Sequence, residues 1–251
     1  MEDMIEFRNV HKSFGPQKVL DDVSLKIPKG QTSVIIGPSG TGKSVFIKLL
    51  VGLLKPDAGE IFIHGKDITR LRERDLYEIR KRFGMLFQDG ALFDSMTVAE
   101  NIAFPLHRHT KKKESEIKAI VAGKLAQVGL PGAEHKFPGQ LSGGMRKRVG
   151  IARALALEPE IVLFDEPNSG LDPVMSDAID KLILRMQKDL GLTFIVISHD
   201  LEGTFQIADR IAMLYKGKLI ADGEAEAVRR SDNPILRQFF GRSSEGPIQV
   251  V

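Results

Sequence analysis

Three groups of residues in this chain are of the types that bind phosphate or a divalent cation. The first is a loop of the pattern G-x-x-x-x-G-K-[S/T], made of Gly37, Pro38, Ser39, Gly40, Thr41, Gly42, Lys43 and Ser44. Glycines let a backbone turn its N–H groups toward a polyphosphate, and a following helix adds roughly half a positive charge at its N-terminus. We expect Lys43 to reach the β- and γ-phosphates and the Ser44 hydroxyl to bind Mg²⁺, which prefers oxygen ligands.

The sequence around this loop predicts a strand before it and a helix after it. Residues 32–36 form a short continuous apolar run, which is typical of a buried parallel strand. Apolar residues then recur at helical spacing: Phe46, Leu49, Leu50, Leu53 and Leu54. The alternative is an ordinary glycine-rich turn, and the match on both flanks disfavours it.

The second group is a pair of adjacent carboxylates, Asp165 and Glu166, at the end of the predicted buried strand 160–164. Two carboxylates beside a buried strand are costly to desolvate unless they serve a charge. A magnesium ion with a reactive water would supply that reason, and the nearby phosphate loop makes this interpretation the stronger one.

Polar residues also end two further predicted strands, at Gln88 after 83–87 and at His199 after 193–198. Taken alone, each has a plainer reading, because many strands end in polar residues and a single histidine is more often structural. If these strands run parallel, Gly37, Gln88, Glu166 and His199 share the sheet edge at which open α/β sheets bind ligands.

The third group lies at the start of a predicted helix and consists of Ser142, Gly143 and Gly144. A serine and two glycines at a helix N-terminus form a second candidate anion site. Arg, Lys and Arg follow at 146–148, where cations oppose the helix dipole. Either these side chains lie in water, or an anionic group lies nearby.

Composition sets limits on the class of protein. The chain has 251 residues, of which 42% are hydrophobic and 27% charged, as in ordinary globular proteins. It contains no cysteine, so disulfides and thiolate metal sites are excluded. There is no apolar run of membrane-spanning length and the N-terminus is acidic, so we expect a cytosolic protein. The net charge of +3 is spread along the chain and gives little reason to expect nucleic-acid binding.

Other patterns predict the supporting elements. Alternating apolar residues up to position 27 predict short antiparallel strands, with Phe14 just before the first turn, where a packed core position is the plainer interpretation. Asp172 is expected to cap a helix that Gly191 ends. His107 and His109 have no cysteine or clear carboxylate partner, so a metal site there is improbable.

Together these motifs resemble the nucleotide-binding subunit of an ABC transporter. They match Walker A at 37–44, the Q-loop at Gln88, the signature at 141–145, Walker B at 161–165, the D-loop at 169–172 and the switch histidine at His199. Phe14 matches the aromatic residue that stacks on adenine. The resemblance implies an α/β P-loop NTPase with a RecA-like core, an antiparallel β subdomain and an inserted helical subdomain. It implies one domain over 1–251, with its core at 1–88 and 158–241, its helical subdomain at 89–157 and a tail at 242–251.

The resemblance also implies the reaction and its participants. Two chains form a head-to-tail homodimer, with ATP and Mg²⁺ between the Walker A loop of one subunit and Ser142, Gly143 and Gly144 of the other. Glu166 acts as general base, His199 contacts the γ-phosphate, and Asp165 and Gln88 help to hold Mg²⁺ and water. Asp172 lies in the D-loop at the same interface. The partners are integral-membrane permease subunits, and the place is the cytoplasmic face of the inner membrane, with peripheral attachment.

Three stretches narrow the resemblance to the ATPases of Mla and Mce systems, which move lipids across bacterial envelopes: residues 87–93, 105–110 and 143–148. Met145 replaces the Gln common in the broad family. This subfamily implies an accessory subunit and substrate-binding Mla or Mce components, without nucleic acid. An importer of another small solute and a non-transport ABC ATPase stay open as alternatives, although the 97 residues at 45–141 hold no sustained heptads of the kind a repair ATPase carries.

The last residues, 242–251, contain Gly, Ser and Pro, which disfavour a helix. A disordered terminus is the ordinary expectation. Ile248, Val250 and Val251 are apolar enough to dock in a groove, and the segment resembles the tails of Mla-type ATPases. The hypothesis is that this tail contacts the second ATPase subunit or an accessory protein.

Overall fold

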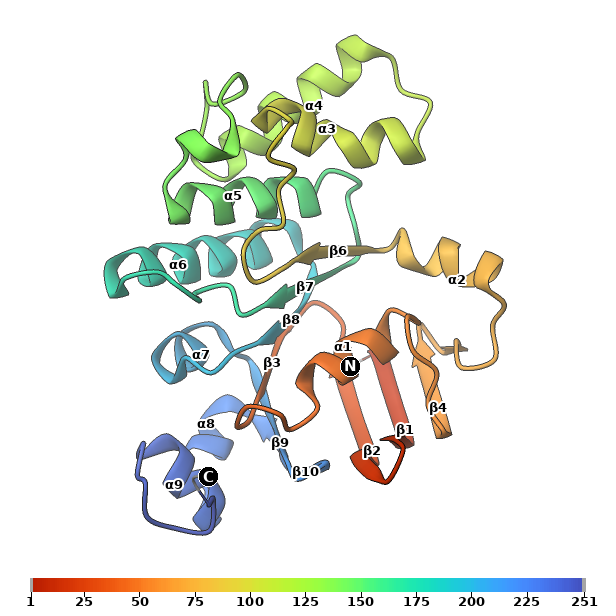
Figure 1. Ribbon diagram of the computed structural model, residues 1–251, viewed down its shortest axis with the longest axis vertical. Coiled ribbons are helices and arrows are strands. Elements are labelled where there is room, and N and C mark those ends of the chain that lie inside the picture. Colours follow the sequence, from red (N-terminus) through yellow and green to blue (C-terminus); the bar gives the residue numbers. More distant parts are fainter. Residues whose placement is uncertain (1, 250–251) are drawn as a thin grey trace. The chain divides into compact units, whose positions relative to one another are not determined.

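Strands and helices follow the apolar periodicity of the sequence throughout residues 2–249, which the computed structural model describes. Within them the chain forms two units (Figure 1). The first unit takes the chain up to Leu71 and again from Ser198, and the second unit is Arg72–Ile197. The predicted limits of the helical subdomain, 89–157, stay a prediction.

The first unit contains most of the strands. Its elements are β1 (Asp3–Phe14), β2 (Gln17–Pro28), β3 (Thr32–Ile36), α1 (Lys43–Leu50), β4 (Ala58–Ile63), β5 (Lys66–Asp67), α7 (Leu201–Ile207), β9 (Arg210–Tyr215), β10 (Lys218–Glu224), α8 (Ala225–Arg229) and α9 (Pro234–Phe240). Four of the strands form an antiparallel sheet in the order β2-β1-β4-β5. The predicted antiparallel strands are confirmed, but β1 and β2 are longer than expected, because Phe14 pairs with Gln17 across a tight turn.

The phosphate loop lies on a second set of strands in the first unit. β3 pairs in parallel with β9, and β9 pairs antiparallel with β10. All five residues of β3 are buried, as its apolar run predicts. The Phe7 ring of β1 stacks on the Phe46 ring of α1, with centroids 4.3 Å apart, so the helix after the loop packs on the antiparallel sheet.

The second unit contains a parallel sheet and most of the long helices. Its elements are α2 (Glu73–Arg80), β6 (Phe83–Leu86), α3 (Val98–His109), α4 (Glu114–Gln127), a 3₁₀ helix η1 (Pro138–Gln140), α5 (Gly143–Ala154), β7 (Ile161–Asp165), α6 (Pro173–Leu190) and β8 (Thr193–Ile197). β7 pairs in parallel with β6 on one side and with β8 on the other. The Phe164 and Phe194 rings meet edge to face in its core.

The sequence signals for helix ends in this unit are confirmed. Thr97 and Glu100 form the capping box of α3, and Asp172 caps α6, which ends at a left-handed Gly191. None of the described helices is both long and apolar enough to cross a membrane.

The described part of the C-terminal tail folds back on α9 and forms no helix. The buried side-chain amide of Gln238 donates to the carbonyl oxygens of Ser243 and Ile248, at 3.2 and 3.0 Å, and accepts from the Ile248 N–H at 2.6 Å. The Tyr215 hydroxyl donates to the Pro247 carbonyl at 3.1 Å. The predicted docking of Val250 and Val251 falls outside the described residues.

Candidate nucleotide-binding site

The loop between β3 and α1 has the backbone that its glycines predict. Gly37, Gly40 and Gly42 have φ angles of +149°, +77° and +100°, in the region that favours glycine. A Cβ at Gly37 would overlap the carbonyl oxygen of Leu214 on β9, so no larger residue fits there. These residues let the loop leave the buried strand and turn tightly into α1.

Lys43 begins α1 and lies against its own loop. Its ammonium nitrogen is 2.6 Å from the carbonyl oxygen of Gly37 and 2.9 Å from that of Pro38. The Thr41 hydroxyl donates to the Pro38 carbonyl at 2.8 Å and braces the same turn. The N-cap of α1 is Gly42, which has no side chain with which to cap the helix. An ammonium and a helix N-terminus on a glycine loop suit the charge and donor needs of a polyphosphate. Ser39, Gly40 and Ser44 are exposed.

Phe14 stands at the end of β1 with 47% of its surface exposed, so the packed-core interpretation is wrong. Asp57 fixes this end of the strand, because one of its carboxylate oxygens lies 2.7 Å from the Lys12 ammonium and the other accepts from the Ser13 N–H at 2.7 Å. These two contacts hold the pKa of Asp57 below its ordinary value of 3.8. An exposed aromatic ring on a braced strand end can stack on a nucleotide base.

His199 belongs to the same unit and is exposed. The Ser198 N–H donates to the carbonyl oxygen of Ile35 on β3 at 3.3 Å. This bond brings the segment that carries His199 to the end of β3, from which the phosphate loop departs. Asp200 then caps α7, since its side chain accepts from the Glu202 N–H.

In the second unit, parallel pairing brings Gln88 and Glu166 to the same end of neighbouring strands. Leu86 of β6 lies opposite Phe164 of β7, so both polar residues follow two positions later. The Gln88 side-chain amide donates to the Ser169 hydroxyl at 3.0 Å.

The two predicted carboxylates differ in backbone conformation. Asp165 is the last residue of β7, opposite Ile197 of β8. Glu166 has a left-handed φ of +51°, and its N–H donates to the Ile197 carbonyl at 3.0 Å. A non-glycine residue in this region is strained, and such strain concentrates at functional sites.

The signature residues begin α5. Ser142 is its N-cap, and its hydroxyl accepts from the Met145 N–H at 3.2 Å. A Cβ at Gly144 would overlap the end of the flexible Met175 side chain on α6. Asp172 accepts at 3.0 Å from each of two N–H groups in the first turn of α6.

Sequence reasoning missed the role of Lys147. It is only 4% exposed, and its ammonium contacts the carbonyl oxygens of Gln88 and, at 3.2 Å, Glu166. For this residue the expectation of a side chain in water is wrong, because the ammonium is buried against neutral backbone carbonyl oxygens, with carboxylates of Asp89, Glu166 and Asp165 acting on it as the nearby anionic groups. A signal existed, because Lys147 lies three positions after Gly144 and four before Ile151, on the buried face of the helix.

A buried Asp180 was also missed. It is 2% exposed and accepts from the Asn168 side-chain amide at 3.0 Å, which braces the chain just after Glu166. The histidine interpretation needs one correction, since His107 has a carboxylate neighbour, with its Nε2 atom 3.9 Å from Glu114. Within residues 2–249, no cluster of histidines and carboxylates that could hold a metal occurs.

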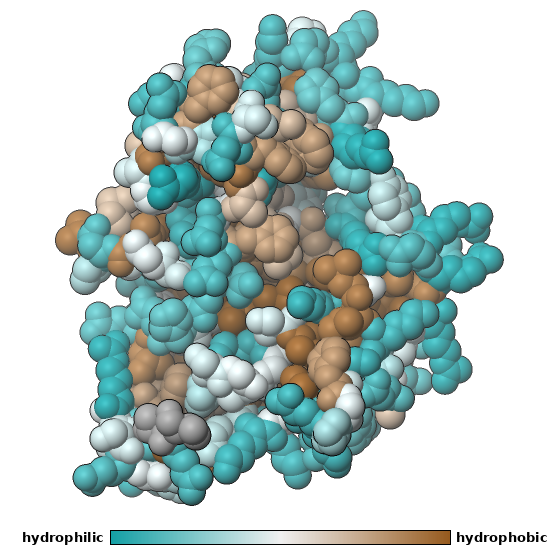
Figure 2. Space-filling model, viewed as in Figure 1, coloured by the Kyte–Doolittle hydropathy of each residue, from teal (hydrophilic) through white to brown (hydrophobic). Residues whose placement is uncertain are grey.

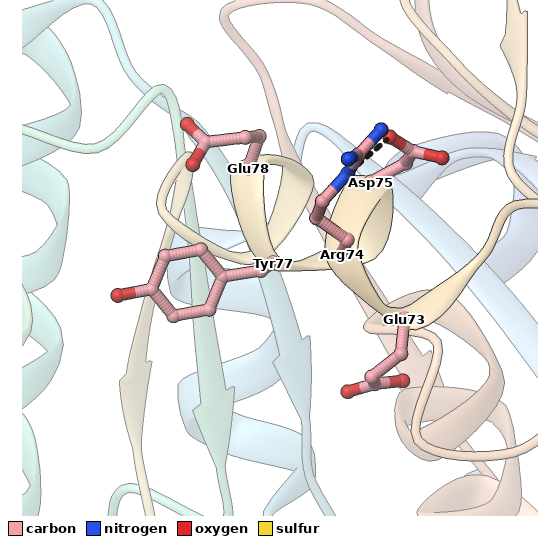
Figure 3. Close-up of a pocket in the computed structure, with 5 residues that line it drawn as sticks. All are labelled: Glu73, Arg74, Asp75, Tyr77 and Glu78. Atoms are coloured by element: carbon pink, nitrogen blue, oxygen red, sulfur yellow. Dashed lines mark ion pairs between the residues drawn. The ribbon is translucent and has the colours of Figure 1, made fainter.

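A hollow lies on α2, and its lining does not suit a polyphosphate. Figure 3 shows its lining side chains: Glu73, Arg74, Asp75, Tyr77 and Glu78. The only cation among them pairs with a carboxylate, since Arg74 Nε lies 3.8 Å from Asp75. Each of the three carboxylates of the lining also pairs with a cation, Glu73 with Arg80, Asp75 with Arg72 and Glu78 with Lys81, so the cations at this surface are engaged in ion pairs.

The predicted site residues thus fall into two sets. The first unit holds Phe14, the loop 37–44 and His199, and the second holds Gln88, 142–144, Asp165, Glu166 and Asp172. Each set is organised by strand ends or helix caps of its own unit. That both sets serve one nucleotide stays a prediction.

Comparison with known proteins identifies the family. A family model described as ABC transporter matches residues 20–169. The chain belongs to the ABC transporter family, as one of its ATP-binding and ATP-hydrolysing subunits. Solved structures agree, and a dimeric bacterial ABC transporter cassette, MJ0796, matches with a TM-score of 0.81 and 31% identity over 88% of this chain and 99% of that one. The predicted class, an α/β P-loop NTPase, is confirmed.

Two groups of relatives are similar in sequence to the chain over nearly its whole length. The probable ribonucleotide transport ATP-binding protein mkl of Mycobacterium tuberculosis is 51% identical over 244 residues, which cover 97% of this chain and 68% of the relative. The intermembrane phospholipid transport system ATP-binding protein MlaF of Haemophilus influenzae is 44% identical over 248 residues, which cover 99% and 94%. The resemblance to Mla-type ATPases is confirmed.

Proposed function

We propose that this chain hydrolyses Mg-ATP to drive the transport of phospholipids or related lipids across a bacterial envelope. The observation that carries the ATPase part is the loop at 37–44, where left-handed glycines and a lysine meet an uncapped helix start. The lipid part rests on the MlaF relatives, which the chain matches over 94% of their length in H. influenzae.

In the proposed reaction the phosphate loop binds and orients the nucleotide. The Lys43 ammonium exchanges its carbonyl partners at Gly37 and Pro38 for phosphate oxygens, and Phe14 stacks on the base. Glu166 accepts the proton of the attacking water, and His199 contacts the γ-phosphate. Positioning and charge stabilisation supply most of the rate in such phosphoryl transfers.

The residues proposed for magnesium fit a hard cation. Ser44, Gln88 and Asp165 offer only oxygen ligands, and Mg²⁺ takes few protein ligands while keeping several waters. When bound, the ion neutralises charge on the phosphates. Gln88 already has an orienting partner in Ser169, which limits the positions that its side chain adopts.

A head-to-tail homodimer completes the proposed site. Ser142, Gly143 and Gly144 of one subunit face the phosphate loop of the other, with Asp172 at the same interface. The similarity to MJ0796, an ATP-binding cassette solved as a dimer, supports dimerisation. The tail 242–251 is proposed to contact the second ATPase subunit or an accessory protein. Deleting it should weaken assembly, measured by analytical ultracentrifugation, while ATP binding at Lys43 is kept.

The proposed permease-docking surface is the one around Gln88 to Phe104, which carries exposed apolar side chains. Phe87, Phe93 and Phe104 are each more than 40% exposed, and the last two rings lie 4.9 Å apart. Figure 2 shows hydrophobic side chains, in brown, gathered near the middle of the face in view, with hydrophilic side chains around them. Exposed apolar patches mark partner surfaces. The chain would then sit peripherally on the cytoplasmic face of the inner membrane, bound to permease subunits and Mla- or Mce-type components.

Purification from membranes tests this proposal. The chain should co-purify with a permease and sediment with membranes only when that permease is present. Membrane association that persists without the permease would argue for direct lipid binding, and replacing Lys111, Lys112 and Lys113 with Ala would then release the chain.

A second substrate class has support in the name of the mkl relatives. One assay of the purified complex distinguishes a lipid cargo from a ribonucleotide cargo. Phospholipid vesicles should stimulate ATP hydrolysis if the cargo is lipid, whereas added ribonucleotides other than ATP should do so if the cargo is a ribonucleotide.

A further inference from the structure

The helix that carries the signature residues, α5, is fastened along one side to the segment 86–91. The Arg153 guanidinium donates to the carbonyl oxygens of Gly90 and Ala91, each at 2.7 Å. Gly150 lies on the same helix between Lys147 and Arg153, and a Cβ there would come within 2.6 Å of a Leu86 methyl carbon. We name this contact, formed by Lys147, Gly150 and Arg153 against 86–91, the α5 seam.

Lys147 extends the seam beyond the segment 86–91. Its ammonium contacts the Gln88 carbonyl and reaches the Glu166 carbonyl at 3.2 Å, so one buried cation joins α5 to the residues that follow both β6 and β7. Burial lowers the pKa of Lys147, and the carboxylates of Asp89, Glu166 and Asp165 oppose that change. A buried ammonium is costly unless it is hydrogen-bonded and its charge is offset. The two carbonyl oxygens supply the hydrogen bonds, and the carboxylates offset part of the cost of burial.

The backbone of Glu166 makes this contact relevant to chemistry. Its left-handed φ of +51° is a strained conformation that persists only when the surroundings hold it. Its N–H is held by Ile197 and its carbonyl accepts from both Lys147 and the Ser169 N–H, at 3.2 and 3.1 Å. The direction of the Glu166 side chain depends on this backbone.

We propose that Lys147 is a positioning residue for ATP hydrolysis, whose ammonium fixes the backbones of Gln88 and Glu166 and ties both to the signature helix. The inference rests on the proposed roles of Gln88 and Glu166. In this proposal Lys147 links α5 to Gln88 and Glu166. The start of α5 is proposed to face the partner subunit's nucleotide, and Gln88 and Glu166 are proposed to orient magnesium and water. Arg153 and Gly150 hold the same helix against the segment 86–91.

The first experiment compares steady-state ATP hydrolysis by Lys147→Met, Lys147→Arg and a control, Lys181→Met. Lys147→Met leaves two carbonyl oxygens without their cation, so kcat should fall about tenfold or more while KM for ATP changes by less than about threefold. Lys147→Arg restores a cationic donor and should recover most of the rate. Lys181 is a mainly exposed lysine of α6 that pairs with Asp177, and its replacement should leave kcat unchanged. A wild-type kcat in Lys147→Met overturns the proposal.

The second experiment needs no hydrolysis. The chain contains no tryptophan, so Phe87→Trp places a single indole next to Gln88. Adding Lys147→Met should raise acrylamide quenching of that indole and lower its anisotropy, whereas adding Lys181→Met should change neither. If the parent protein hydrolysed no ATP, the proposed function would fail while this readout still tested the seam. An indole insensitive to Lys147→Met overturns the link.

A merely structural role is separated by the unfolding temperature. Such a role would lower the midpoint of thermal unfolding without changing the kcat of the folded protein. If Lys147→Met does not fold, Lys147→Gln keeps a neutral donor and takes its place in both experiments. Wild-type kcat in Lys147→Gln overturns the requirement for a charge.

Discussion

The side-chain amide nitrogen of Gln88 lies 3.0 Å from the hydroxyl oxygen of Ser169 and donates a hydrogen bond to it. The two residues are 81 positions apart in the chain. Their contact joins the segment after β6, at Gln88, to the segment after β7, at a residue three positions beyond Glu166. A residue proposed for magnesium and water is thus oriented before any ligand arrives.

This contact predicts the behaviour of Ser169→Ala. Loss of the hydroxyl leaves Gln88 without its orienting partner, so we expect kcat to fall by about three- to tenfold with little change in KM. The contact is exposed, so the thermal unfolding midpoint should stay the same. Ser169→Thr keeps the hydroxyl and serves as the control. Equal kcat values for the alanine and wild-type proteins would show that the hydrogen bond does not matter for turnover.

The proposed division of work between Lys43 and Glu166 predicts different failures. Lys43→Ala removes the ammonium from the phosphate loop and should abolish ATP binding. Glu166→Gln removes the base and should preserve binding while trapping an ATP-bound dimer. Equilibrium binding of a fluorescent ATP analogue and size-exclusion chromatography with ATP measure the two outcomes. Normal hydrolysis by Glu166→Gln would sink the base assignment.

The shared site predicts the activity of mixed dimers. Ser142→Arg should disable the site that one subunit forms with the partner's phosphate loop, and Lys43→Ala should disable its own. A heterodimer of the two variants keeps one intact composite site, so partial activity is expected where each homodimer is inactive.

Two controls accompany the mixing experiment. Ser142 is the N-cap of α5, and its loss costs about 1 kcal/mol, so the folding of Ser142→Arg must be checked by thermal unfolding. Heterodimers must be demonstrated with two different tags. Complete inactivity of a proven heterodimer would rule out the arrangement in trans.

Phe14 is predicted to contribute to base binding and little to folding. Stacking on an aromatic residue contributes about 1–3 kcal/mol per base, so Phe14→Ala should raise the Kd for ATP about fivefold or more. Its ring is 47% exposed, so the unfolding midpoint should change little. Phe14→Tyr keeps the stacking surface and should bind like the wild type. A loss of affinity for ATP but not for inorganic triphosphate would assign the effect to the base.

The pKa of Asp57 predicts part of the pH dependence of stability. Its folded-state pKa lies below the ordinary 3.8 because of Lys12 and the Ser13 N–H. Its stabilising effect is therefore present above about pH 4 and is lost as the pH falls through the folded pKa, since the unfolded chain binds the proton more readily. Asp57→Asn lacks this contribution. Urea unfolding should show the variant less stable than the wild type at pH 7, with the difference shrinking toward pH 3. A constant difference would contradict this origin.

The sequence was sufficient for the buried parallel strands and for the helix caps. β3, β7 and β8 are short continuous apolar runs, a pattern that depends only on local residues. The extent of β1 and β2 could not be predicted, because bulges such as that between Phe7 and Val10 interrupt the alternation along one face.

Lys147 shows why part of the site stays hidden in a sequence. Its helical spacing indicates a buried face but does not indicate what the ammonium contacts there. Its burial depends on carbonyl groups 59 and 19 positions away, at Gln88 and Glu166. Backbone carbonyls carry no residue identity, so no motif records them as partners.

The absence of a side chain at two glycines has a consequence for mutational scanning. A Cβ at Gly84 would overlap the Ala154 carbonyl, and one at Gly150 would crowd Leu86, so α5 and β6 meet where no side chain fits. In a saturation library scored by growth, both positions should reject even alanine. Their profiles would match those of the phosphate-loop glycines, although neither touches a phosphate. Sorting the same library by protein abundance would separate these two positions from Gly40 of the phosphate loop, where a Cβ meets no atom within 4 Å.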